Sequence, residues 1–86
     1  ERRHAPLIHQ LLSAAVERLR SGDRDFTAME RTGIAALEQA GFRPDYFSVR
    51  RADDLSTPDA ATKHLVVLTA ARLGRARLID NLQARV

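Results

Sequence analysis

The segment that most limits the fold is HLVVLTAARL, residues 64–73, which is apolar at almost every position. Successive side chains of a β-strand point to opposite faces of its sheet. Both faces here are apolar: Leu65, Val67 and Leu73 lie on one, and Val66, Leu68 and Ala70 on the other. Such a strand is typical of the middle of a sheet that is covered on both sides. We therefore predict that residues 64–73 form a central strand in which Leu68 is buried.

A second strand is predicted directly after this one. Gly74 marks a turn, and the following segment, RARLIDNL at 75–82, again alternates. Leu78 and Leu82 share one face of it, and Ile79 lies on the other. Because the link between the two strands is so short, they are expected to form an antiparallel hairpin.

The remaining strand is predicted at Tyr46–Val49, which is rich in aromatic and β-branched residues. Pro44 has no N–H to donate to a ladder, so it fits at the first residue of a strand. Residues 51–63 are polar and rich in turn-forming residues, and Pro58 interrupts regular structure there. We expect this stretch to be a connection between strands.

The first half of the chain has a helical pattern instead. A stripe with three- and four-residue spacing runs through residues 5–20 and consists of Ile8, Leu11, Leu12, Ala15, Val16 and Leu19. A Ser-Gly pair ends this helix. A second helix is predicted at roughly 25–40, with Asp23 or Asp25 as its N-cap and Gly41 just past its end.

Gly33 lies inside the second helix, where glycine costs about 1 kcal/mol relative to alanine. A glycine kept there indicates close packing, which we place against the first helix.

Because few residues separate the two helices, they are expected to pair as an antiparallel hairpin. The predicted fold class is α+β: residues 1–86 form a single domain with an N-terminal helical hairpin followed by a small three-stranded antiparallel β-sheet.

Composition excludes several classes of protein. The chain has no cysteine, which excludes disulfides, thiol nucleophiles and cysteine zinc sites. No apolar run approaches the ~20 residues that cross a bilayer, and no apolar signal segment opens the chain, so a cytoplasmic location is expected. The net charge is +3, and thirteen of the fourteen basic residues are arginine. This balance leaves a small basic nucleic-acid-binding or protein-interaction module as an alternative.

A nucleic-acid platform is disfavoured by the aromatic residues. Binders of single strands place aromatic side chains on one sheet face among basic residues. Tyr46 and Phe47 are adjacent, so they are expected to point to opposite faces. A salt-dependent affinity for an oligonucleotide would support the alternative.

The chain offers no complete active site. His4 and His9 are five residues apart and do not share a helix face, and His64 stands alone. Asp53 and Asp54 are interpreted as a solvated turn or cap. The remaining candidates are a phosphate-facing patch or a solvated rim formed by Arg50, Arg51, Arg72, Arg75 and Arg77. We expect no catalytic residue and no metal ligand in this chain.

Two segments together resemble a known family. GFRPDYFSVRRADDL at 41–55 and LVVLTAARLGRARLIDN at 65–81 resemble the C-terminal domain of the pantothenate synthetase family, also called pantoate–β-alanine ligase. That family has a Gly-Phe-x-Pro-Asp-Tyr segment before a Val/Ile-Arg pair, and later a Leu-Gly turn before Thr-Arg-Leu-Ile-Asp-Asn. The matching residues are Gly41, Phe42, Pro44, Asp45, Tyr46, Arg50, Leu73, Gly74, Arg77, Leu78, Ile79, Asp80 and Asn81. Ala76 stands where the family has threonine, so one hydroxyl is missing.

The resemblance implies a role in a larger enzyme. In the family, an N-terminal Rossmann-like domain carries a His-x-Gly-His motif and binds ATP and pantoate. With ATP and Mg²⁺, pantoate forms pantoyl adenylate, and the amine of β-alanine then displaces AMP. The C-terminal domain is the lid over that cleft. By this resemblance the chain starts just after the family's Ser-Ser-Arg-Asn stretch, and its partner is the N-terminal domain of the same protein. The chain alone is expected to be inactive. No cofactor, nucleic acid or membrane is expected to bind it.

The resemblance places Arg77 in the Arg-Leu-Ile-Asp-Asn motif, and alternation places it on the strand face opposite to that of Leu78. Two roles are possible for it. Arg77 is predicted to face outward, toward ATP or the partner domain. A guanidinium there can make bidentate contacts with a phosphate or a carboxylate. The other possibility is that Arg77 pairs locally with Asp45 or Asp80 and only steadies the sheet.

Overall fold

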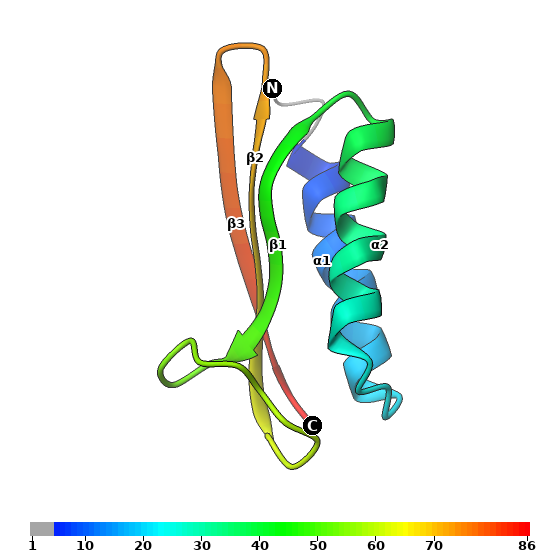
Figure 1. Ribbon diagram of the computed structural model, residues 1–86, viewed down its shortest axis with the longest axis vertical. Coiled ribbons are helices and arrows are strands. Elements are labelled where there is room, and N and C mark those ends of the chain that lie inside the picture. The colour runs from blue at the N-terminus through cyan, green and yellow to red at the C-terminus, as the bar shows by residue number, and fades with distance from the viewer. Residues whose placement is uncertain (1–4) are drawn as a thin grey trace.

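A computed structural model describes residues 5–86 as two helices followed by three strands. The elements are α1 (Ala5–Arg20), α2 (Phe26–Gln39), β1 (Arg43–Arg51), β2 (His64–Leu73) and β3 (Ala76–Arg85). The strands pair antiparallel in the order β1-β2-β3. Both helices lie on the same side of this sheet (Figure 1). The predicted α+β fold is confirmed, although β1 is longer at both ends than the predicted 46–49, and β3 starts one residue later and ends three residues later than the predicted 75–82.

Local signals in the sequence set the ends of the helices. Gly22 has a φ of 100° after α1, a left-handed conformation that glycine adopts without strain. Its N–H donates to the carbonyl of Leu19 at 3.1 Å. Of the two predicted N-caps, Asp25 caps α2, since its Oδ1 accepts from the N–H of Ala28 at 3.1 Å. Asp23 accepts from the N–H of Asp25 and so steadies the turn before the cap.

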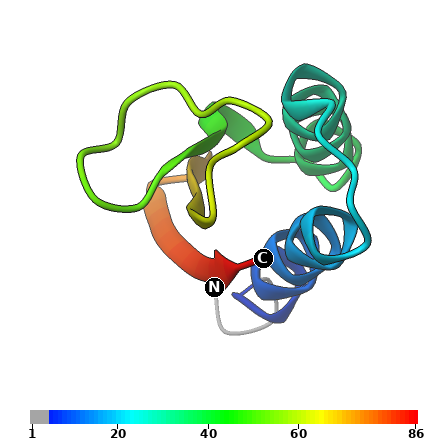
Figure 2. The same ribbon diagram turned by 90° about the horizontal axis from the view of Figure 1, so that it is seen from below.

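The helices share the inner face of the sheet between them. α2 packs mainly on β1, while α1 packs mainly on β3 and also reaches β2. Figure 2 shows the two helices side by side on one side of the sheet. Between helices and sheet lies one core, formed by Ile8, Leu12, Ala15, Val16, Leu19, Met29, Leu37, Phe42, Phe47, Val49, Leu65, Val67, Ala71 and Ala84. Neither described helix has the length and hydropathy needed to cross a membrane.

The predicted partner of Gly33 was wrong. A Cβ built on Gly33 would lie 2.6 Å from Cδ2 of Phe47, and closer still to Cγ and Cδ1 of that ring. The glycine therefore packs against the first strand and not against α1. It lets α2 approach β1 until the helix backbone lies on the face of the Phe47 ring.

β2 is the central strand, as predicted, but the prediction for Leu68 was wrong. Leu65 and Val67 face the helices and are fully buried, whereas Leu68 lies on the outer face and is only half-buried. Its cross-strand neighbours are Ser48 on β1 and Asn81 on β3. These side chains are short and polar, and no helix among residues 5–86 covers this face, so Leu68 keeps contact with solvent.

Candidate functional site

A β-bulge in β1 sets the position of Asp45. Pro44 pairs with Ala71 and Tyr46 with Ala70, so Asp45 is an extra residue between two consecutive pairs. Regular alternation would place it on the inner face with Phe47. The bulge turns its carboxylate to the outer face instead, since bulges re-aim the side chain that they insert.

The Asp45 carboxylate lies between two arginines. Arg72 on β2 and Arg77 on β3 are directly opposite each other in the ladder, an arrangement in which like charges repel. Nε of Arg77 donates to Oδ2 of Asp45 at 2.8 Å, and Nε of Arg72 lies 3.6 Å from Oδ1. The hydrogen bond from Arg77, with the charges of both arginines, holds the pKa of Asp45 below its usual value against the opposing effect of partial burial.

Arg77 therefore has a local partner, and that partner is Asp45 and not Asp80. Asp80 accepts a hydrogen bond from the backbone N–H of Asn81 at 2.8 Å. Only Nε of Arg77 is engaged among residues 5–86, and its side chain is 41% exposed. A guanidinium has five N–H donors, so its terminal nitrogens stay available to a further acceptor on the outer side.

Other arginines surround this pair. Arg43 lies opposite Arg72 in the β1–β2 ladder, and Arg75 lies in the β2–β3 turn next to Gly74. Neither has an ion-pair partner among residues 5–86. We call Arg43, Arg72, Arg75 and Arg77 the arginine cluster. With one aspartate among four arginines, this end of the sheet is strongly basic and suited to an anionic group.

Beside the arginine cluster, the outer face of the sheet is hollowed, with apolar and polar side chains in the lining. We call this area the outer hollow; it is lined by Tyr46, Ala52, Leu55, Val66, Leu68, Ile79, Asp80, Asn81 and Gln83. Ile79 and Leu55 are 63% and 54% exposed, and they are the exposed large apolar residues of the described chain. Leu55 was missed by the sequence analysis, in which the 51–63 connection is simply polar. The one signal was a leucine inside that polar run.

Side chains satisfy the backbone groups of Val49 on the free edge of β1. The backbone N–H of Val49 donates to Oε2 of Glu30 at 2.9 Å, and Nη1 of Arg50 donates to the same oxygen at 3.1 Å. Nη1 of Arg50 also donates to the carbonyl of Val49 at 2.9 Å. Charged side chains that cover backbone groups of an edge strand hinder pairing with another strand at that point. Arg50, one of the candidates for the phosphate patch, is therefore occupied at the edge, and Glu30 was not foreseen.

The other candidate residues are dispersed. Nε2 of His64 contacts Oε1 of Gln83 at 2.8 Å. Nε of Arg51 lies 3.8 Å from Oδ1 of Asp53 and 4.0 Å from Oδ1 of Asp54. Both carboxylates belong to a turn, as interpreted. His9 lies exposed on α1, and His4 is outside the described residues. Nowhere in residues 5–86 do three histidine or carboxylate side chains gather in a way that would hold a metal ion.

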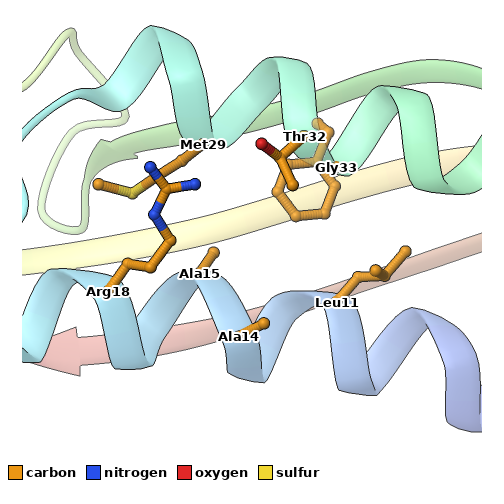
Figure 3. Close-up of a pocket in the computed structure, with 8 residues that line it drawn as sticks. Leu11, Ala14, Ala15, Arg18, Met29, Thr32 and Gly33 are labelled. Atoms are coloured by element: carbon orange, nitrogen blue, oxygen red, sulfur yellow. The ribbon is translucent and has the colours of Figure 1, made fainter.

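A second crevice lies between the helices above the Phe47 ring. Figure 3 shows its lining, which is Leu11, Ala14, Ala15, Arg18, Met29, Thr32, Gly33 and Phe47. Its one titratable side chain is Arg18, whose Nε is bound to Asp23 at 2.9 Å. Phe47 is buried beneath Gly33 while Tyr46 lines the outer hollow. The two aromatic residues point to opposite faces, as predicted, and do not form a platform for bases.

Comparison with known proteins gives one consistent family. Residues 1–83 match the family model described as pantoate-beta-alanine ligase. The chain is 49% identical over 86 residues to a pantothenate synthetase of Nitrosococcus oceani and 48% identical over 81 residues to one of Methylococcus capsulatus. These matches cover 100% and 94% of this chain but only 30% and 28% of the relatives. The crystal structure of pantothenate synthetase from Thermus thermophilus superposes with a TM-score of 0.79 at 30% identity, over 94% of this chain and 29% of that one.

Proposed function

The chain belongs to the pantoate-beta-alanine ligase family, and on that premise we propose that it is the C-terminal lid of a cytoplasmic ligase. The complete protein would condense pantoate with β-alanine, using ATP. The observation that carries this proposal is the match of residues 1–83 to the family by a chain that spans about 30% of the length of its relatives. The chemistry is then assigned to the remaining part of the polypeptide.

The residues of the chain support this division of labour. The described residues bring together no group of three histidine or carboxylate side chains that could hold a metal ion, so they do not fit a site for Mg²⁺. Their contribution is a plate made of a three-stranded sheet with two helices on one side. Such a plate can cover a cleft without taking part in bond formation.

The proposed reaction gives a cover a physical purpose. The pantoate carboxylate attacks the α-phosphorus of ATP and forms pantoyl adenylate with release of pyrophosphate. The amine of β-alanine then attacks the acyl carbon and displaces AMP. An acyl adenylate also reacts with water, which would waste ATP. Closing the cleft excludes water and strengthens the electrostatic interactions inside it.

Arg77 is the residue that we propose for contact with the covered site. Its Nε is held by Asp45 at 2.8 Å, which fixes the plane of the guanidinium and leaves the terminal nitrogens for a phosphate of ATP or an acidic group of the other domain. In this proposal Asp45 positions Arg77, and the local pair and the outward contact coexist.

The test compares the complete ligase with the 86-residue chain. Pantothenate and AMP are quantified after incubation with pantoate, β-alanine, ATP and Mg²⁺. We expect the complete protein to form both products in equal amounts and the 86-residue chain to form neither. A complete protein that folds but does not consume ATP in the presence of pantoate would refute the proposed reaction. Pantothenate formation by the 86-residue chain would refute the assignment of the chemistry to the rest of the polypeptide.

A further inference from the structure

We propose that the outer hollow, with the arginine cluster beside it, is the face by which this domain docks on the preceding part of its own polypeptide. This inference rests on the proposed function, because it names the surface through which the lid closes. The alternative surface is the helical layer on the opposite side of the sheet.

The exposed apolar side chains of the domain are gathered on this face. Ile79 and Leu55 are 63% and 54% exposed and line the same hollow, although they come from β3 and from the connection after β1. On the described parts of the helices, by contrast, the large apolar side chains are buried in the core or, like Leu11 and Ile34, partly buried against it. Gathered exposed apolar residues mark an interaction surface, whereas scattered ones do not.

The backbone at Leu55 supports the same conclusion. Leu55 has a φ of 63°, the one non-glycine residue with a positive φ in the described chain. A bulky side chain in this region is strained, and here it is held by a tight turn in which its N–H donates to the carbonyl of Arg51 at 2.9 Å. A strained residue is kept where the surroundings or the function require it. The turn holds an apolar side chain at the rim of the hollow, where the described residues give it no cover.

The length of the family relatives and the positive charge of this face point to the partner that docks there. The family relatives are about three times as long as this chain, which spans 30% of the Nitrosococcus oceani protein. The first turn of α1, where that additional polypeptide would join, lies at the same end of the molecule as the β2–β3 turn (Figure 1). That turn carries Arg75 and adjoins Arg72 and Arg77. The partner surface is therefore expected to insert an apolar side chain into the hollow and to present carboxylates, or a bound polyphosphate, to the arginines.

The test uses cysteine labelling of the complete ligase. This chain has no cysteine of its own, so an introduced thiol is identified by its peptide in mass spectrometry. The probes are Ile79→Cys and, as a second position in the hollow, Leu55→Cys. The matched control is Ala35→Cys, at an exposed position on α2. The protection of each position is the labelling rate of the variant unfolded in urea divided by the labelling rate of the same variant when folded. Pantothenate formation confirms that each variant is folded.

We expect protection at both hollow positions and none at Ala35. A lid that is open about one-tenth of the time labels about tenfold more slowly than a free surface, because labelling proceeds through the open state. ATP with pantoate should increase the protection further.

Three results would overturn the inference. Equal labelling of Ile79→Cys and Ala35→Cys in an active enzyme would show that the outer hollow is not covered, and would leave the ligase proposal intact. Protection of Ala35→Cys alone would place the interface on the helical layer. Protection of Ile79→Cys that disappears on dilution would assign the hollow to a second copy of the protein.

Discussion

Substituting Gly33 by alanine tests how closely α2 approaches the sheet. Helix propensity alone predicts that Gly33→Ala stabilises α2 by about 1 kcal/mol. The structure predicts the opposite, because the new Cβ would lie 2.6 Å from Cδ2 of Phe47 and closer to two further ring atoms. Ordinary carbon contacts are about 3.5–4.0 Å, so the helix or the ring has to move by about 1 Å.

The ring has little room to move, since Phe47 is buried with 4% of its surface exposed. Overpacking of a well-packed core costs about 1–3 kcal/mol, and a severe collision belongs at the upper end. After the gain in helix propensity, we expect Gly33→Ala to lower the free energy of unfolding by about 1–2 kcal/mol. For a domain of this size that lowers Tm by roughly 5–15 °C.

The double variant Gly33→Ala/Phe47→Leu separates the collision from other effects. Leucine lacks the flat ring, so the alanine methyl then fits into space that the shorter side chain leaves. In urea unfolding, the two changes should be less harmful together than the sum of the single changes, with a coupling of about 1 kcal/mol or more. A Gly33→Ala variant that is more stable than the parent would refute the close approach of α2 to Phe47. Strictly additive effects of the two substitutions on the free energy of unfolding would refute it as well.

Four further predictions follow from the fold and the site. Leu65→Ala should lower the free energy of unfolding by about 2–5 kcal/mol and Leu68→Ala by clearly less, since Leu65 is fully buried and Leu68 is only half-buried; equal shifts in the urea midpoint would contradict this burial pattern. Asp25→Ala should cost about 1 kcal/mol through loss of the α2 N-cap, and the same Tm as the parent would show that the cap is not used. The pKa of Asp45 is lowered from 3.8, so its contribution to stability is present above that pH and is lost as the pH falls through the folded-state pKa; Asp45→Asn should make the decline of Tm in acid shallower, and an identical decline would argue against the ion pair. Arg77→Ala in the complete ligase should raise the KM for ATP or slow adenylation with Tm nearly unchanged, because its pair with Asp45 is exposed; a lower Tm with unchanged kinetics would remove Arg77 from the site.

The fold was predictable because its signals are local. The alternation around Leu78 and Ile79 defines a strand without knowledge of its neighbours, and Gly22 ends a helix through its own backbone preference. The α+β class and the antiparallel order of β2 and β3 needed nothing more than these patterns and a two-residue turn.

The errors concern contacts between elements. The burial of Leu68 depends on which residues lie opposite it, and Ser48 is 20 residues away in the sequence. The partner of Gly33 depends on how α2 settles on the sheet. Neither relation has a local signature, because each is decided when separate segments pack.

The site was predicted only in part for the same reason. Arg77 was identified as outward-facing from alternation and motif, and Asp45 was considered as its partner. Their actual meeting requires the bulge between Pro44 and Tyr46, which a sequence pattern does not reveal. The contact of Glu30 with the backbone of Val49 likewise joins residues 19 positions apart.

The central claim is that this domain keeps water from an activated acyl group. The most direct measurement is the ratio of AMP released to pantothenate formed, determined at low β-alanine for the complete ligase and for a protein truncated before this chain. We predict a ratio near one for the complete ligase and a clear excess of AMP for the truncated protein, because its adenylate is open to hydrolysis. A truncated protein that forms the adenylate and keeps the ratio near one would contradict the account.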